Sequence, residues 1–384
     1  MFKFIVASNE LKGLLDMVSS VIVSKSVLPI LSNVLVQAKD GDYFAVGSSS
    51  ENELTVPFTT LRVTEGRFAD FCISPDVSKV LGTLSAQTLT VTIDNGNAKV
   101  EYENGEFDIP VDGSENFPRI QPIHDESRKV AFDAESADLF PTMSKAVACV
   151  NRGDSILPIR SAVLIDAVND GYVIVGTNGH KLLKRSTLPG IPFLKSGAPT
   201  QLIIPQSVIR ALSNAFANVD TVHIEADNRV SHFYSDAGMS MYITTIEGHY
   251  PNYNAFISQN QDYHVIVNFK ALVTALKRVV LFSSTESSLI LLSCEKDSEL
   301  SIQSRDIDFS RAGKETIFCQ ECNIPNGFVI GLNGTDFIKV VSLTAAENVC
   351  LMMSDPSRAI TIKEDDPKSS LVLLQMPLVL PKNM

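Results

Sequence analysis

Histidine and cysteine are the residue types in this chain that could do chemistry, and the spacing of the histidines matches no recognised catalytic motif. His180 ends the polar segment Thr177–His180, and Ser161 and Asp166 are close in sequence, so His180 could act as a general base. A single exposed histidine without a marked nucleophile is more often a surface or contact residue. The chain has no phosphate loop and no GxGxxG, HExxH, GxSxG or EF-hand pattern. We therefore expect a protein that is not an enzyme and needs no cofactor.

Cys319 and Cys322 have the C-x-x-C spacing of redox and zinc motifs. A structural zinc site needs two further ligands, and no second C-x-x-C or H-x-x-x-H follows. The other histidines considered are too scattered to form a ligand set: His223, His232, His249 and His264. We expect no metal, and a redox role for the C-x-x-C stays open as an alternative.

The composition is that of an ordinary globular protein. With 384 residues, 45% hydrophobic and 20% charged, the chain suggests two to four domains. A net charge of −12 gives no overall sign of nucleic-acid binding, but a local basic surface is still possible. We find no secretory signal and no apolar stretch near the roughly 18 residues of a membrane span. A cytoplasmic location is the simplest expectation.

The segment from Pro158 to Arg185 belongs to an internal repeat. It reads as two short strands, a turn at Asn169–Gly171 and an exposed loop. A first copy begins at Pro29, 129 residues earlier, and keeps several identities in register, including Val46-Gly47 with Val175-Gly176. A diverged third copy runs from Ser288 to Arg311.

Helical patterns flank each copy. Leu11, Leu14 and Leu15 show the i, i+3, i+4 spacing of an amphipathic helix. The predicted first helices span 9–21, 136–150 and 269–282, and the predicted second helices span 74–84, 205–216 and 334–343. Strands follow each second helix, and the first copy ends in a hairpin over 100–109 with Asn104-Gly105 as its turn.

These elements predict an α+β fold of three repeated domains, each with antiparallel sheets and two helices packed on one face. Segments rich in Pro, Asn, Ser and Gln separate the copies. We place the domains at residues 1–126, 127–254 and 255–384.

Cations collect on the predicted helices: Lys12, Lys79, Lys145, Arg210, Lys270, Lys277, Arg278 and Lys339. The acids of these helices, Asp336 among them, lie toward the helix starts, where the macrodipole favours negative charge. One interpretation is that the cations belong to ordinary solvated faces. The other is that they form one basic surface for a phosphate backbone.

Geometry is compatible with the second interpretation. If two chains formed a ring lined by about twelve helices spaced about 9 Å apart, the helix axes would lie on a circle roughly 34 Å across. Subtracting a helix diameter of about 10 Å leaves a hole of about 24 Å, wide enough for a duplex of about 20 Å.

The C-terminal segment 373–380, LLQMPLVL, is unusually apolar for a chain end. It could be a last strand that closes the third sheet. Alternatively, its Met and Leu side chains could form one wall of a pocket for short hydrophobic peptides.

Three motifs together resemble a known family. TNGHKL at 177–182 is similar to a T-D-G-H-R-L loop, EGHYPNY at 247–253 resembles a D/E-G-R-F-P-D-Y segment, and QMPLVL at 375–380 ends the repeat. In this order and spacing they resemble the beta sliding clamps of bacterial DNA polymerase III. The resemblance covers essentially the whole chain.

The resemblance implies a head-to-tail homodimeric ring around duplex DNA, without sequence specificity or catalysis. Its partners would be the polymerase catalytic subunit and the clamp loader, bound through short hydrophobic motifs. The implied peptide pocket comprises Thr177, Gly179, His180, Lys181, Leu182, Pro251, Phe256, Leu374, Met376, Pro377 and Leu378. The implied DNA-binding set comprises Lys12, Lys25, Lys79, Lys145, Arg152, Arg210, Lys270, Lys277 and Lys339. The implied dimer interface comprises Phe107, Ile109, Leu281 and Phe282.

Overall fold

The computed structural model describes residues 1–23, 26–123, 129–153, 156–187, 190–257, 261–296, 298–306 and 309–380. Lys25, one of the predicted DNA contacts, lies outside the described residues. The chain forms two compact units, one of Met1–Phe140 with Pro189–Glu247 and one of Pro141–Leu188 with Gly248–Met384.

One order of elements occurs three times along the chain: a strand, a helix, three strands, a further strand, a second helix and three final strands. The predicted alternation of helices and strands is therefore confirmed, with extra short strands in the first two copies. Every pairing between described strands is antiparallel, which confirms the predicted α+β class.

The first unit contains a 14-stranded sheet in the order β14-β10-β16-β17-β18-β4-β3-β2-β6-β9-β8-β7-β1-β5. Its strands are β1 (Phe2–Ala7), β2 (Val34–Lys39), β3 (Asp42–Ser48), β4 (Asn52–Pro57), β5 (Arg62–Glu65), β6 (Phe71–Ile73), β7 (Thr88–Asp94), β8 (Asn97–Tyr102), β9 (Gly105–Gly113), β10 (Val130–Glu135), β14 (Phe193–Leu194), β16 (Thr221–Ala226), β17 (Val230–Tyr234) and β18 (Ser240–Thr244). The chain also forms β15 (Gln201–Pro205).

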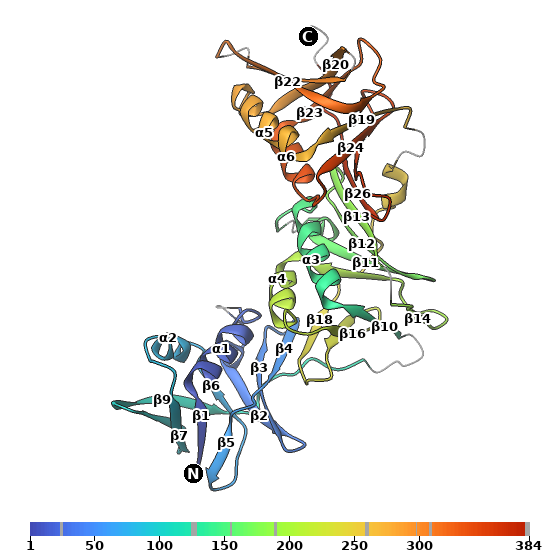
Figure 1. Cartoon of the computed structure of the whole chain (residues 1–384). Helices are drawn as coiled ribbons and strands as arrows, with labels where there is room; N and C mark the ends of the chain where they lie inside the picture. The colour runs from blue at the N-terminus through green and yellow to red at the C-terminus, as the bar shows by residue number, and fades with distance from the viewer. Residues whose placement is uncertain are drawn as a thin grey trace. The chain divides into compact units, whose positions relative to one another are not determined.

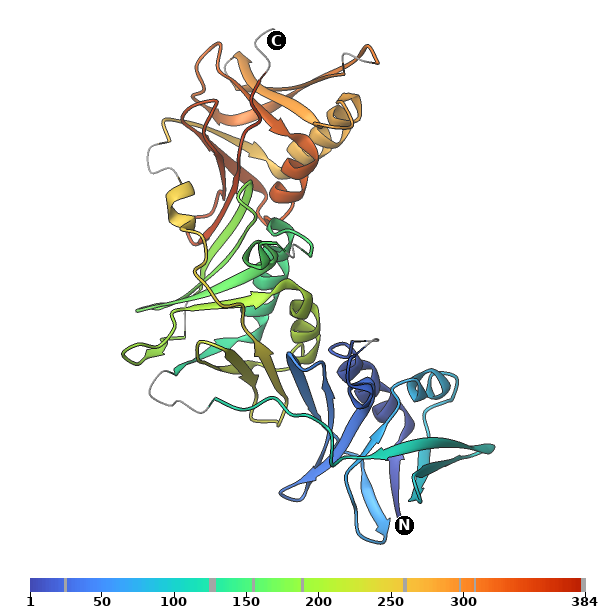
Figure 2. The same ribbon diagram turned by 180° about the vertical axis from the view of Figure 1, so that it is seen from behind.

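In the second unit the strands follow the order β11-β12-β13-β26-β25-β24-β19-β22-β21-β20-β23. They are β11 (Ala162–Val168), β12 (Gly171–Thr177), β13 (Lys181–Thr187), β19 (Tyr263–Asn268), β20 (Leu289–Lys296), β21 (Glu299–Asp306), β22 (Arg311–Cys322), β23 (Val329–Asn333), β24 (Asn348–Met353), β25 (Ile360–Glu364) and β26 (Leu371–Gln375). Seen from behind in Figure 2, the red C-terminal strand β26 lies beside the green β13.

The six predicted helices form, with shorter ends than expected. They are α1 (Ser8–Ser19), α2 (Val77–Leu81), α3 (Ser136–Ala146), α4 (Gln206–Ala215), α5 (Phe269–Val279) and α6 (Gly334–Val341). Tighter 3₁₀ turns complete α3 and α5, at Val147–Cys149 and at Val280–Phe282 (η6). The prediction for α2 was too long, because Gly82 follows its last turn. In both views α5 and α6 lie together on one face of their sheet (Figures 1 and 2).

Apolar stripes hold the helices on the sheets. In α1 the predicted stripe is buried, with Leu15 and Val18 at 1% and 0% exposure. In α5, Leu272 and Leu276 are fully buried. Burying such side chains contributes about 1.5–3 kcal/mol each.

The glycine repeated at an offset of 129 residues has a packing reason. A Cβ on Gly47 would lie 2.3 Å from the Val18 carbonyl oxygen, and a Cβ on Gly176 would lie 2.3 Å from the Ala146 carbonyl oxygen. In the first two copies the end of the first helix therefore contacts bare strand backbone. Any side chain at these positions would force the helix away from the sheet.

The predicted turn of the 100–109 hairpin was wrong by one residue. Tyr102 pairs with Gly105, so Glu103 and Asn104 form the two-residue loop. Neither Asn104 nor Gly105 takes a positive φ, so the left-handed geometry expected of an Asn-Gly turn is not used. Gly105 instead leaves room for the Tyr102 ring, whose hydroxyl would lie 2.6 Å from an added Cβ.

Candidate peptide-binding site and charged helix faces

The loop between β12 and β13 is held in one conformation by its own side chains. The Thr177 hydroxyl donates to the Lys181 carbonyl at 2.7 Å and accepts from the Gly179 amide at 3.1 Å. The Asn178 side-chain oxygen accepts from the amides of His180 and Lys181, each at 3.0 Å. Gly179 has φ +90°, a conformation that favours glycine. The loop thus presents the exposed His180 side chain from a fixed backbone.

The buried Tyr250 side chain holds this loop in place through hydrogen bonds. Its hydroxyl accepts from the Thr177 amide at 3.1 Å and lies 3.1 Å from the Ala162 carbonyl oxygen, to which it donates. The ring is buried, and burial raises the pKa of the phenol, so the hydroxyl keeps its proton. The EGHYPNY motif therefore supports the TNGHKL loop through Tyr250.

We expect Tyr250→Phe to lower the free energy of unfolding by about 1–2 kcal/mol, because the buried Thr177 amide would lose its partner. Chemical denaturation measures this change. Tyr234→Phe is the matched control, since its hydroxyl makes a longer 3.3 Å bond to Glu225 on a partly exposed face. Equal losses in the two variants would contradict the anchoring role of Tyr250.

The C-terminal tail joins the loop through strand pairing. β26 pairs with β13, which places Leu374 opposite Leu182 and Gln375 opposite Lys181. The Met376 amide then donates to the His180 carbonyl at 2.8 Å. Further on, the Leu378 amide donates to the Gly331 carbonyl of β23 at 2.8 Å. The segment is thus a strand up to Gln375, as the first interpretation of its sequence predicts, and a tail beyond it.

The predicted pocket residues lie in the second unit with different exposures. Leu182 and Leu374 are buried in the sheet, at 1% and 2% exposure, so they support the site from beneath. His180 is exposed, and Met376, Pro377 and Leu378 are half-buried. Val379, next in the tail, is 97% exposed. Pro251 is half-buried, and Phe256 is 38% exposed on the 3₁₀ turn Tyr253–Phe256.

That turn is fixed to the sheet by a polar cluster. The Tyr253 hydroxyl donates to the Asp166 carboxylate at 2.8 Å, and the Lys184 ammonium lies 5.4 Å from the Tyr253 ring centre. Lys184 also donates to the Asn254 side-chain oxygen at 2.9 Å. Burial raises the pKa of Asp166, and the bond from Tyr253 opposes that shift. Asp166 therefore positions the turn.

Asp336 is a site residue that the sequence reasoning missed. Its carboxylate lies 3.1 Å from the ammonium of Lys181 and 3.4 Å from that of Lys339. Lys181 is only 8% exposed, and an unpaired ammonium there would be costly. In the sequence, Asp336 looked like an ordinary acid at a helix start. The structure also assigns the cap of α6 to Asn333, which accepts from the Asp336 amide at 2.9 Å.

The predicted DNA-contacting cations fall into two groups. Lys12 pairs with Asp16 at 2.6 Å, Lys79 with Asp76 at 2.6 Å, and Lys339 with Asp336. Arg278, a helix cation outside the predicted DNA-binding set, forms a bidentate ion pair with Glu315, which lowers the pKa of that carboxyl. In the described part of the chain, the following cations have no carboxylate within ion-pair distance: Lys145, Arg152, Arg210, Lys270 and Lys277.

The predicted interface residues lie beside strand edges in the two units. Phe107 and Ile109 are half-buried on β9. Leu281 and Phe282, on η6, are 71% and 42% exposed. Phe282 packs on Gly313 of β22, where an added Cβ would lie 2.7 Å from the Phe282 ring.

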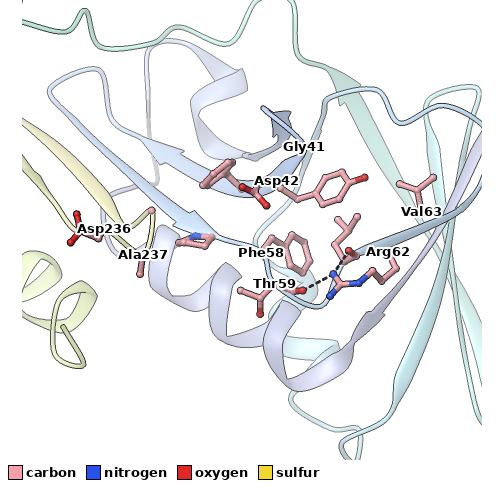
Figure 3. Close-up of a pocket in the computed structure, with 13 residues that line it drawn as sticks. Gly41, Asp42, Phe58, Thr59, Arg62, Val63, Asp236 and Ala237 are labelled. Atoms are coloured by element: carbon pink, nitrogen blue, oxygen red, sulfur yellow. Dashed lines mark hydrogen bonds between the residues drawn. The ribbon is translucent and has the colours of Figure 1, made fainter. Parts of the chain in front are cut away.

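A cavity of about 730 Å³ in the first unit lies beside β3 and β4 (Figure 3). Asp236 and Ala237 border it on one side, and Phe58 is among the residues that line it. Arg62 donates to the backbone carbonyls of Thr59 at 2.6 Å and Leu61 at 2.8 Å, so its guanidinium serves the local loop. No residue of the predicted peptide, DNA or dimer sites lines this cavity.

The described residues contain no group of three or more His, Cys, Asp or Glu side chains that could hold a metal ion. Across the same residues, no helix has the length and apolar character of a membrane span.

Two domain profiles match the chain. The N-terminal domain profile of the DNA polymerase III beta subunit matches residues 2–121, and the C-terminal domain profile matches residues 255–378. The chain belongs to the DNA polymerase III beta subunit family, the beta sliding clamps.

Named beta sliding clamps align over nearly the full length. The clamp of Rickettsia felis is 20% identical, with 97% of this chain and 99% of that protein covered. The clamp of Escherichia coli K12 is 22% identical, with 98% and 99% covered. The family resemblance drawn from the three motifs is confirmed.

Solved clamps share the fold. A sliding clamp of Pseudomonas aeruginosa bound to griselimycin superposes with a TM-score of 0.88 at 19% identity, over 99% of this chain and 100% of that one. The beta subunit of Thermotoga maritima gives 0.84 at 18% identity, with the same coverage. The beta-clamp fold thus persists where four residues in five differ.

Proposed function

We propose that two copies of this chain close head to tail into a ring around duplex DNA, with three modules from each copy at residues 1–126, 127–254 and 255–384. The ring would act without catalysis as a cytoplasmic processivity factor. It would tether the polymerase catalytic subunit and the clamp loader through short hydrophobic peptides.

The observation that carries this proposal is the way the repeats join inside the chain. In each repeat, three consecutive strands follow the first helix, and the third of these is β4, β13 or β22. Each repeat ends in a last strand, which is β9, β18 or β26. Inside the chain, β4 pairs with β18 and β13 pairs with β26, both antiparallel. One strand of each kind, β22 and β9, is left over.

The leftover strands have open edges along part of their length. In the described strands, residues 105–110 of β9 pair only with β8, and residues 311–318 of β22 pair only with β21. Unpaired edges are templates for another strand. Pairing β9 of one copy with β22 of the other would repeat the join already made twice, with Phe107, Ile109, Leu281 and Phe282 beside it.

The mass of the particle in solution tests this closure. Sedimentation equilibrium is expected to give twice the chain mass of 41.8 kDa. A particle of one chain mass at micromolar concentration would favour an open scaffold that binds partners without encircling DNA.

We propose that the cations without ion pairs carry most of the DNA contact. The slope of log K against log salt becomes more negative by about 0.9 for each phosphate that the protein neutralises. We expect Arg210→Ala and Lys270→Ala each to weaken duplex binding and to make this slope less negative by about 0.9, measured by fluorescence anisotropy.

Lys79→Ala is the matched control, because Asp76 already neutralises the Lys79 ammonium at 2.6 Å. Its slope is expected to change clearly less. If Lys79→Ala changed the slope as much as Arg210→Ala, the distinction between paired and unpaired cations would be wrong.

We propose the peptide pocket at the loop and tail of the second unit. The exposed His180, the half-buried Met376 and the half-buried Leu378 present apolar and amphipathic surface on a backbone fixed by hydrogen bonds. Preorganisation of this kind lowers the entropic cost of binding a flexible peptide.

A further inference from the structure

Three cysteines that the clamp function does not use come together in the second unit. Residues three apart on a regular strand lie on opposite faces. In β22, however, the ladder to β19 is irregular: Val265 pairs with Cys322, Ile266 with Glu321 and Val267 with Cys319. The extra residue of this bulge brings Cys319 and Cys322 to the same face of the sheet. Their pairing partners on β19, Val265 and Val267, are fully buried.

The third cysteine comes from β20. The Cys294 sulfur lies 2.6 Å from the Cys322 sulfur, compared with about 2.05 Å for a disulfide bond. The Cys294 thiol also lies 3.1 Å from the Glu299 carbonyl oxygen, to which it donates. The sequence motif would pair Cys319 with Cys322, but the fold pairs Cys322 with Cys294.

This pair connects two differently paired parts of the sheet. The first residues of β22 pair with β21 and its last residues pair with β19. Cys322 lies on the part joined to β19, whereas Cys294 lies on β20, which is not a neighbour of β19 in the sheet (Figure 1). A covalent link between the two sulfurs would fix the two parts of the sheet to each other.

We propose that Cys294 and Cys322 form a reversible disulfide when the protein meets a low-molecular-weight disulfide such as oxidised glutathione. The Cys322 thiolate attacks one sulfur of the oxidant, forms a mixed disulfide and releases one thiolate. Cys294 then attacks the Cys322 sulfur and displaces the second small thiol, which takes the Cys294 proton. Two protein thiols are oxidised and one small disulfide is reduced to two thiols.

The surroundings of the three thiols determine the order in which they react. Cys322 is half-buried and the most accessible of them, so it reacts first. Burial, reinforced by the contact with Cys322, raises the pKa of Cys294 to about 12, so Cys294 stays protonated until the mixed disulfide forms beside it. Cys319 is fully buried, and burial raises its pKa to about 11, so it is a bystander.

The test is to equilibrate the full-length protein in glutathione buffers of increasing oxidised fraction, alkylate the remaining thiols and map the peptides by mass spectrometry. Wild type and Cys319→Ser are both expected to yield a peptide linked through Cys294 and Cys322. Cys294→Ser is expected to stop at a mixed glutathione disulfide on Cys322. The oxidised wild type should also unfold several degrees higher than the reduced form, because the link restricts the unfolded chain.

Three results would overturn the proposal. The first is a wild type whose thiols all stay reduced in fully oxidised glutathione. The second is a link between Cys319 and Cys322 in place of the expected one. The third is a Cys294→Ser variant that still forms an intramolecular disulfide through Cys322. The mapping of wild type requires no substitution, so the test stands even if a variant folds poorly.

Discussion

Phe282→Asp is expected to convert the proposed dimer into a monomer. The Phe282 ring packs on Gly313 beside the open edge of β22 and is 42% exposed in the single chain. In the proposed dimer, the Phe282 side chain would be buried against the other copy. A carboxylate there would have to lose its water without a partner. Truncating an interface anchor of this kind weakens the binding free energy by about 2–4 kcal/mol, and burying an unpaired charge weakens it more.

We therefore expect the dimer dissociation constant to rise at least about 100-fold, measured by sedimentation velocity over a dilution series. Phe193→Asp is the matched control, because Phe193 is 61% exposed on β14, a strand that neighbours neither β9 nor β22 in the sheet order. Circular dichroism checks that both variants fold. A Phe282→Asp protein that stays dimeric at nanomolar concentration would refute the assigned interface.

Met376→Ala is expected to weaken peptide binding about 10- to 100-fold while leaving the proposed dimer intact. The Met376 amide is fixed to the His180 carbonyl, so its half-buried side chain stands beside the TNGHKL loop. Methionine adapts its shape to apolar ligands, and its removal takes away contact area without adding charge. Anisotropy of a labelled synthetic peptide rich in Leu and Phe measures the effect.

Val379→Ala is the control from the same tail, since Val379 is 97% exposed and makes no comparable bond to the loop. Its peptide affinity should match that of wild type. Equal affinities of wild type and Met376→Ala would show that the peptide binds elsewhere, while the proposed ring would be unaffected.

Much of the fold could be predicted from local signals. The spacing of Leu11, Leu14 and Leu15 predicted α1, and the matches at an offset of 129 residues predicted the repeated strands. The ends of elements were less predictable. Gly82 follows the last turn of α2, and the hairpin at 100–109 has Glu103-Asn104 as its loop, with Tyr102 packed where a side chain on residue 105 would stand.

The candidate site was predicted through its motifs and not through its contacts. TNGHKL and the tail could be singled out, but their pairing through β13 and β26 joins residues nearly 200 positions apart. Asp336 escaped notice because an acid at a helix start already has a local explanation, and its partner Lys181 lies 155 residues away. The C-x-x-C spacing gave no sign of Cys294 as a contact of Cys322, since only the tertiary fold brings β20 to that end of β22.

The central claim is that the protein holds DNA by encircling it. Retention on nicked circular DNA, compared with the same DNA after linearisation, tests it most directly, once the clamp loader has placed the protein on the circle. A ring of two chains should stay on the circle and leave within minutes through the ends of the linear form, even at a salt concentration that screens phosphate contacts. Equal retention on both forms would contradict the claim.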